Sequence, residues 1–145
     1  MPGSYRIIPR QGIVYVEYHG RASLDDARTL LERYMADPDR RPGQRQLIDL
    51  SRVTSWEKDF VGLMKYQADS AARVFAPQGA MMMVIYARTP AGLELGQHFV
   101  QAWSGIHGIV VTLQTTEAEA LSVLGQTEAR IPDLLEAPAD APRNG

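Results

Sequence analysis

The chain has 145 residues, of which 45% are hydrophobic and 22% are charged, and its formal net charge is −2. This length and composition are typical of one globular domain. The absence of cysteine excludes disulfides, thiolate metal sites and a cysteine nucleophile together. A net charge near zero gives no support for a nucleic-acid partner. No apolar run approaches the roughly 20 residues of a membrane-spanning helix, and residues 1–6 lack the apolar stretch of a secretion signal. We therefore expect a cytoplasmic domain that needs no metal or cofactor, binds no nucleic acid and does not insert into a membrane.

The beginning of the chain predicts a β-hairpin. Residues 5–8 form a short apolar run, and residues 12–18 alternate in a way that places Ile13, Tyr15 and Glu17 on one face. The residues between the two runs are typical of a tight turn, so the two strands are expected to pair.

Further strands and helices follow in alternation. Strands are expected at 47–50, 80–87 and 109–113, and residues 51–58 are expected to form a polar connection. Each helix is expected to begin after a side chain that accepts a hydrogen bond from a free backbone N–H group, namely Ser23, Asp59, Thr89 and Thr116. Gly125 is expected to end the last helix.

The apolar stripe of the second helix includes Phe60, Leu63 and Met64, which are expected to face the core. The order β-β-α-β-α-β-α-β-α predicts an α/β sandwich whose mixed sheet has a parallel core and an antiparallel hairpin at its edge. Residues 1–125 are expected to form this single domain. Residues 126–145 are expected to be an acidic, proline-containing tail that docks around 131–135 and is otherwise flexible.

Residues 49–56 read Asp-Leu-Ser-Arg-Val-Thr-Ser-Trp. A strand ending in Asp-Leu-Ser, then one residue, valine, two residues and an apolar residue, resembles the STAS domain. This is the fold of the bacterial anti-anti-sigma factors related to stage II sporulation protein AA. The resemblance covers residues 5–124 and implies the same sandwich, here in a divergent bacterial member.

The chain departs from that family where the family carries its switch. In anti-anti-sigma factors the apolar residue is followed by Asp-Ser-Ser-Gly, and a partner kinase phosphorylates a serine there. This chain has Glu57, Lys58, Asp59 and Phe60 instead, so the acceptor hydroxyl is absent. The resemblance therefore implies a non-catalytic domain for regulatory protein–protein interaction without the serine switch. Thr54 and Ser55 lie just upstream and can be phosphorylated, but they do not align with the acceptor.

The carboxyl ends of the central strands are where open α/β sheets bind ligands. Asp49 lies at one such end, with the alternative that it caps the next turn. Arg88 lies at the next end and either holds an anion or is an ordinary exposed arginine. If these residues share one rim with residues 51–59, an anionic ligand or an acidic tail is expected there. The candidate ligand- or partner-binding residues are Asp49, Ser51, Thr54, Ser55, Trp56, Glu57, Lys58, Tyr86, Arg88 and Thr89.

Other motifs add little. Trp56 is either buried under the second helix or an exposed partner anchor. His19, His98 and His107 lack the spacing of metal ligands, and the chain has no nucleophile elbow and no glycine-rich phosphate loop. No catalytic residue is therefore assigned.

Three functions stay open from the sequence. The first is a protein-interaction domain, with a homodimer as one form of it. The second is a carrier or sensor of a small anionic or apolar ligand. The third is an enzyme, for which the sequence offers the least.

Overall fold

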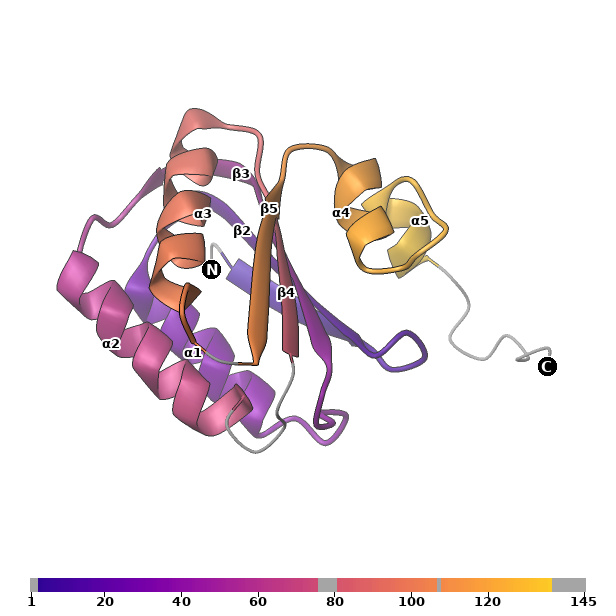
Figure 1. The fold of residues 1–145 in the computed structure, drawn as a ribbon, viewed down its shortest axis with the longest axis horizontal. Helices are drawn as coiled ribbons and strands as arrows, with labels where there is room; N and C mark the ends of the chain where they lie inside the picture. The colour runs from indigo at the N-terminus through magenta and orange to yellow at the C-terminus, as the bar shows by residue number, and fades with distance from the viewer. Residues whose placement is uncertain (1–2, 76–80, 107, 137–145) are drawn as a thin grey trace.

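A computed structural model describes residues 3–75, 81–106 and 108–136 (Figure 1). Its centre is a five-stranded sheet in the order β1-β2-β3-β4-β5. The first two strands form an antiparallel hairpin, and the remaining pairs are parallel. The strands are β1 (Gly3–Ile8), β2 (Ile13–Ala22), β3 (Arg45–Trp56), β4 (Met81–Tyr86) and β5 (Ile109–Gln114). The predicted mixed sheet with an antiparallel edge hairpin is thus confirmed.

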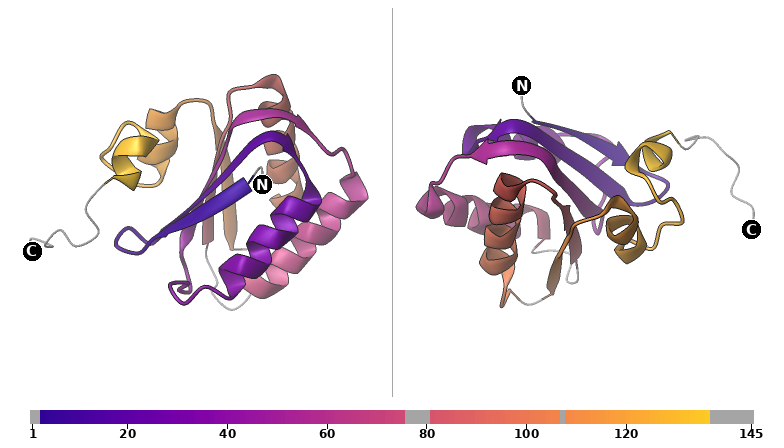
Figure 2. Two further views of the ribbon diagram at one scale, coloured as in Figure 1. Left: turned by 180° about the vertical axis from the view of Figure 1, so that it is seen from behind. Right: turned by 90° about the horizontal axis from the view of Figure 1, so that it is seen from above.

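Helices cover the two faces of the sheet unequally (Figure 2). The chain crosses from β2 to β5 one strand at a time, and right-handed crossovers of this kind place every connecting helix on the same face. That face carries α1 (Leu24–Met35), α2 (Phe60–Ser70) with the π-helical turn η1 (Ala71–Phe75), and α3 (Pro90–Trp103). The opposite face carries α4 (Glu117–Val123) and α5 (Ile131–Leu135).

Each face of the sheet has its own hydrophobic core. The larger core lies beneath α1, α2 and α3 and includes Leu50, Val53, Ile85 and Trp103. The smaller core lies beneath α4 and α5 and includes Ile13, Leu47, Val84, Leu121 and Leu134. Strand alternation sends neighbouring residues such as Val84 and Ile85 to opposite cores.

The predicted helix starts are confirmed. Ser23, Asp59, Thr89 and Thr116 each accept a hydrogen bond from the backbone N–H group three residues further on. Gly125 follows α4 with a φ of 76°, a left-handed conformation that glycine adopts without strain.

The prediction that residues 51–58 form a connection was wrong for residues 51–56, and only Glu57 and Lys58 lie between β3 and α2 as expected. β3 continues to Trp56, because β2 extends to Ala22 and pairs with it through Ala22↔Trp56. Pairing between β3 and β4 stops earlier, at Asp49↔Tyr86. The polar residues that suggested a loop lie on a strand extension paired on one side, where exposed and buried side chains alternate irregularly.

The predicted core stripe of α2 was also wrong in part. Leu63 is buried, but Phe60 and Met64 are 50% and 64% exposed. The buried face of this helix is made by Gly62, Leu63, Gln67 and Ser70. A Cβ on Gly62 would lie 2.6 Å from a methyl carbon of Leu24, so α2 approaches α1 closely through this side.

The chain after Gly125 returns to the sheet. Ile131 and Leu134 of α5 are 3% and 0% exposed and belong to the smaller core. Arg45 holds the end of α4 next to the β1–β2 turn, since its guanidinium donates to the backbone carbonyls of Leu124 and Gln11. Residues 137–145, where the flexible tail is expected, lie outside the described residues, as does His107.

Candidate functional site

A row of polar side chains crosses the sheet near the carboxyl ends of its parallel strands. Glu17 of β2 is the register partner of Asp49 of β3, and Asp49 is the partner of Tyr86 of β4. Adjacent strands lie about 4.8 Å apart, so these three residues form a continuous row on one face. They are on the α4–α5 face, because Tyr15, Leu47 and Tyr86 belong to its core and side chains alternate along each strand.

This row forms the floor of a cleft of about 660 Å³, which we call the carboxyl-edge cleft. Tyr15, Asp49 and Tyr86 are buried at its base, with 6%, 6% and 4% of their surface exposed. The arginines around it are exposed. The cleft is lined by Arg6, Tyr15, Glu17, Asp49, Ser51, Arg52, Tyr86, Arg88, Thr89, Glu117, Arg130, Ile131, Pro132, Leu135 and Glu136.

The floor is organised around the phenol of Tyr15. Its hydroxyl lies 2.5 Å from Oδ2 of Asp49 and 3.1 Å from Oε2 of Glu17. The other carboxylate oxygen of Asp49 accepts the Ser51 backbone N–H at 2.9 Å. Burial, and then the bond to Asp49, raise the pKa of Tyr15 well above its ordinary value. Tyr15 therefore keeps its proton at neutral pH and acts as a donor.

The Tyr86 end of the cleft is lined by the residues that lead into α3. Thr89 donates to the Val53 carbonyl at 2.5 Å and caps α3. Gly92, in the first turn of α3, allows a close approach to β3, because a Cβ there would lie 2.6 Å from the Leu50 carbonyl oxygen. Arg88 is held next to Tyr86, whose pKa is raised by burial and lowered by the hydrogen bond with Arg88, burial being the larger effect.

The structure divides the ten sequence candidates into two groups. Asp49, Ser51, Tyr86, Arg88 and Thr89 all line the carboxyl-edge cleft. The other five, Thr54, Ser55, Trp56, Glu57 and Lys58, do not line it. The expected single rim that included residues 51–59 therefore ends at Arg52.

The second group lies around the start of α2. Trp56 is buried, with its indole N–H donating to Glu94 at 2.7 Å and its ring against Phe60 and His98. Lys58 pairs with the same Glu94 carboxylate at 3.1 Å, and these two donors lower the pKa of Glu94.

The remaining members of that group are Glu57, which caps a helix, and Thr54 and Ser55, which are exposed. Glu57 accepts the Leu24 backbone N–H at 3.0 Å and so caps α1. Thr54 and Ser55 are exposed on the extension of β3.

Sequence reasoning missed more than half of the residues that line the cleft. The charged or hydroxyl-bearing lining residues that it did not select are Arg6, Tyr15, Glu17, Arg52, Glu117, Arg130 and Glu136. Tyr15 and Glu17 carried a signal, since they alternate with Ile13 and so had to lie on the same face. Arg130 carried none, because its position depends on the return of α5 to the sheet.

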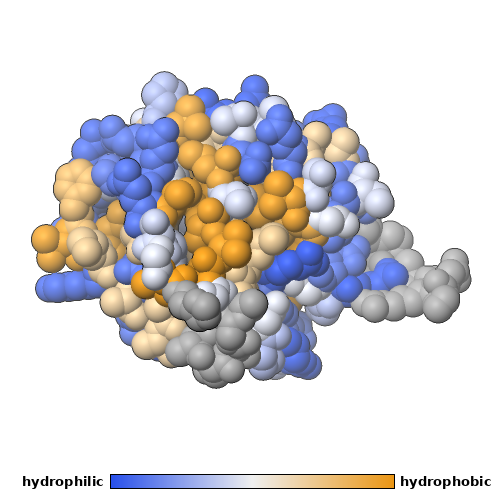
Figure 3. Space-filling model, viewed as in Figure 1, coloured by the Kyte–Doolittle hydropathy of each residue, from blue (hydrophilic) through white to orange (hydrophobic). Residues whose placement is uncertain are grey.

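Two apolar surfaces lie away from the cleft. One is at the start of α2, where Phe60, Val61 and Met64 are 50%, 65% and 64% exposed. The other follows β5, an edge strand of the sheet, on which Val110 is 55% exposed. Figure 3 shows hydrophobic residues gathered over that edge.

Neither sequence comparison nor metal-site geometry assigns a function to the cleft. No family model and no curated protein matches the sequence. Among the described residues, no cluster of three or more histidine, aspartate or glutamate side chains could hold a metal ion. None of the described helices is long and apolar enough to cross a membrane. The geometry of the cleft is therefore the basis for a functional assignment.

Proposed function

We propose that the protein binds a small anionic ligand in the carboxyl-edge cleft. The observation that carries this proposal is the convergence of Arg6, Arg88 and Arg130 on one opening. Across the described part of the chain, none of the three has a carboxylate within ion-pair distance, whereas Arg52 pairs with Glu17 at 3.7 Å. Guanidinium groups bind carboxylates and phosphates through paired charge-assisted hydrogen bonds.

The acidic residues of the cleft are mostly engaged within the protein. Asp49 accepts from Tyr15 and from the Ser51 backbone, and Glu17 lies against Arg52 and Tyr15. Glu117 accepts the Ile131 backbone N–H at 3.0 Å and so fixes the start of α5. The exposed charges left for a ligand are therefore mainly positive.

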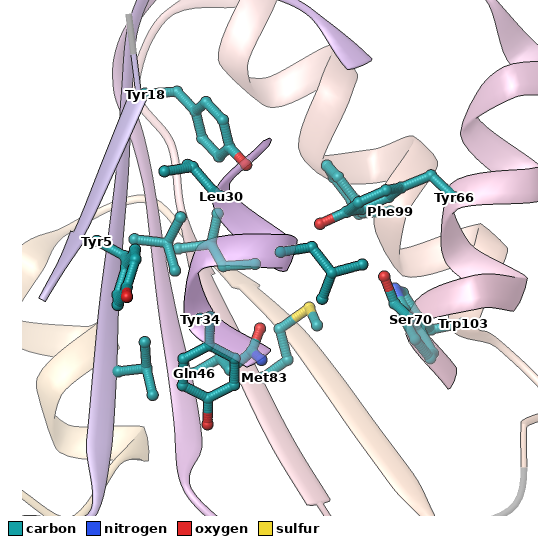
Figure 4. A pocket seen from close by; sticks show the side chains of 14 residues that line it. Tyr5, Tyr18, Leu30, Tyr34, Gln46, Tyr66, Ser70, Met83, Phe99 and Trp103 are labelled. Atoms are coloured by element: carbon teal, nitrogen blue, oxygen red, sulfur yellow. The ribbon is translucent and has the colours of Figure 1, made fainter. Parts of the chain in front are cut away.

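The size of the cleft also supports a small ligand. Its volume of about 660 Å³ is within the roughly 300–1,000 Å³ typical of small-molecule sites. The competing site for an apolar ligand is the cavity between the sheet and α1–α3, into which Tyr18, Tyr66, Phe99 and Trp103 project (Figure 4). That cavity has about 60 Å³, enough for a few water molecules but far below that range.

Calorimetric titration with inorganic phosphate and with succinate tests the proposal. We expect binding of at least one of them, weakened about tenfold or more by Arg88→Ala and by Arg130→Ala, since a charge-assisted hydrogen bond is worth about 1.5–3 kcal/mol. Arg28→Ala is the matched control, because Arg28 lies on α1 and pairs with Asp25. No binding by the wild type, or equal losses in all three variants, would contradict the proposal.

A second candidate function is the one that the family resemblance implies, a STAS-like regulatory interaction domain. It is supported by the sequential order β2-β3-β4-β5 with a helix in each crossover, and by the apolar surface of Phe60, Val61 and Met64. An exposed apolar surface of this kind is typical of a protein interface. We take a second copy of the chain as the partner.

Light scattering after size exclusion tests this second candidate. The wild type should be a dimer at micromolar concentration, and Val61→Glu combined with Met64→Glu should give a monomer with an unchanged melting temperature. Val110→Glu, on the β5 edge, is the control for apolar surface in general and should leave the dimer intact. A monomeric wild type would argue against this candidate and would leave the ligand proposal unaffected.

A further inference from the structure

We infer that the ligand of the carboxyl-edge cleft is a small zwitterion, with an ammonium group at Asp49 and an anionic group at the arginines. This inference rests on the proposed function and adds the chemical class of the ligand. Its starting point is that the lining of the cleft is charge-balanced, with four arginines and four acidic residues. Among these eight residues Asp49 is the buried one, at the base, whereas the four arginines are exposed, as is Glu136.

Asp49 is the group that a purely anionic ligand leaves unexplained. It is 6% exposed, and the two groups that donate hydrogen bonds to it, the Tyr15 phenol and the Ser51 backbone N–H, are both neutral. No cationic side chain of the described residues lies within ion-pair distance of it. A buried carboxylate without a cation is costly, and a simple anion placed next to it would be repelled.

The hydrogen-bond count at the floor also leaves room for a donor. Tyr15 has a single phenolic hydrogen, yet its oxygen lies within hydrogen-bond distance of both Asp49 and Glu17. The shorter contact assigns that hydrogen to Asp49. A carboxylate accepts up to about four hydrogen bonds, so Asp49 and Glu17 retain capacity that an ammonium group, with three hydrogens, can use.

The anionic end of the ligand then lies toward the rim. Arg88 follows β4 at the Tyr86 end of the polar row, and Arg130 comes from the turn before α5. The two arginines thus approach the same opening from different elements, whereas Asp49 belongs to the strand between β2 and β4. A molecule with opposite charges at its two ends, such as a β-amino acid or an amino-alkyl phosphate, can contact Asp49 and the arginines at once.

Two pairs of probes that differ only in the ammonium group test the inference. The pairs are O-phosphoethanolamine against ethyl phosphate, and β-alanine against propionate, each titrated calorimetrically into the wild type. In at least one pair we expect the ammonium-bearing probe to bind about tenfold tighter or more, the range for a charge-assisted hydrogen bond in a buried site. The pair that responds also distinguishes a phosphate ligand from a carboxylate ligand.

Asp49→Asn is the decisive variant, because asparagine removes the charge while keeping one of the two oxygens that accept from Tyr15 and Ser51. It should bring the two members of the responding pair to similar affinity, chiefly by weakening the zwitterion. Glu17→Gln, at a half-buried position, provides a second test if Asp49→Asn does not fold. Equal affinity of both members in the wild type would overturn the inference while leaving anion binding intact. No binding of any of the four probes would overturn the inference and the proposed function together.

Discussion

The two faces of the sheet differ in how far helices cover them. Beneath α1, α2 and α3 the core includes Val14, near the start of β2, and Trp56, at the end of β3. This face is therefore covered from one end of its strands to the other. On the opposite face α4 and α5 cover Ile13, Leu47 and Val84, but the polar row of Glu17, Asp49 and Tyr86 opens into a cleft. Both faces therefore carry a hydrophobic core, but the candidate site lies on the α4–α5 face.

This difference follows from the strands themselves. Along β3, Leu47 and Asp49 point to the same face, yet the first is fully buried in the core and the second accepts hydrogen bonds at the cleft floor. A helix placed over Asp49 would have to supply a partner for a buried charge. The short second layer formed by α4 and α5 leaves that position facing the carboxyl-edge cleft.

Of the changes considered, high pH should lower the free energy of unfolding most, because it acts on buried tyrosines on both faces of the sheet. Burial raises the pKa of the tyrosines on each, Tyr18 on the covered face and Tyr15 in the cleft among them, and raises that of Tyr5 to about 12. Above pH 10 the unfolded chain loses phenolic protons that the folded chain keeps, so stability falls as pH rises, by up to about 1.4 kcal/mol per pH unit for each buried tyrosine.

Phenolate absorbance near 295 nm and far-ultraviolet circular dichroism, recorded together, check this expectation. The phenolate signal should appear with unfolding rather than before it. If Tyr15→Phe removed a phenolate signal that is seen near pH 10 in the folded protein, the cleft floor would be more open than described.

Core truncations should separate the two faces by how far the structure around each equally buried leucine can relax. Leu50→Ala, beneath the three long helices, should cost about 2–5 kcal/mol of unfolding free energy. Leu134→Ala, in α5, should cost toward the lower end of that range, because a helix of only five residues can relax around the cavity. Urea unfolding measures both, and a cost near zero for Leu134→Ala would show that α5 does not cover the sheet.

Removing a phenolic hydroxyl should matter more in the cleft than at the surface. Tyr15→Phe leaves the buried Asp49 without its side-chain donor and should cost about 1–3 kcal/mol. Tyr5→Phe is the matched control, because Tyr5 donates at 2.7 Å to Asp37 in a less buried setting, and it should cost less. Equal losses in urea unfolding would contradict the burial assigned to the floor.

The smallest effect is expected on the β3 extension. Thr54→Ala combined with Ser55→Ala should change stability by no more than about 0.5 kcal/mol, because both side chains are exposed. Affinity for the cleft probes should not change. A clear loss of probe binding would mean that the site extends beyond Arg52.

Much of the fold could be predicted from local patterns. Alternation identified the hairpin, and capping side chains identified the starts of α1, α2, α3 and α4. The end of β3 could not be predicted, because it depends on how far β2 extends beside it. The exposure of Met64 was missed for a similar reason, since the close approach at Gly62 decides which side of α2 faces α1.

The sequence could predict a site residue only where the order of the strands is enough to place it in the cleft. Asp49 and Arg88 follow from the rule that ligands bind at the carboxyl ends of parallel strands. Arg6 and Arg130 come from the antiparallel edge strand and from the segment before α5, so their place in the cleft depends on tertiary packing. Trp56 was named as a site residue, yet it is buried against Phe60 and His98.

The measurement that tests the central claim most directly is an amide chemical-shift titration with O-phosphoethanolamine. We expect saturable shifts concentrated at the backbone amides of Ser51, Arg52, Arg88 and Thr89 and around Arg130, with none at Val61 or Val110. An absence of shifts at saturating probe, or shifts confined to the start of α2, would contradict the assignment of the carboxyl-edge cleft as the ligand site.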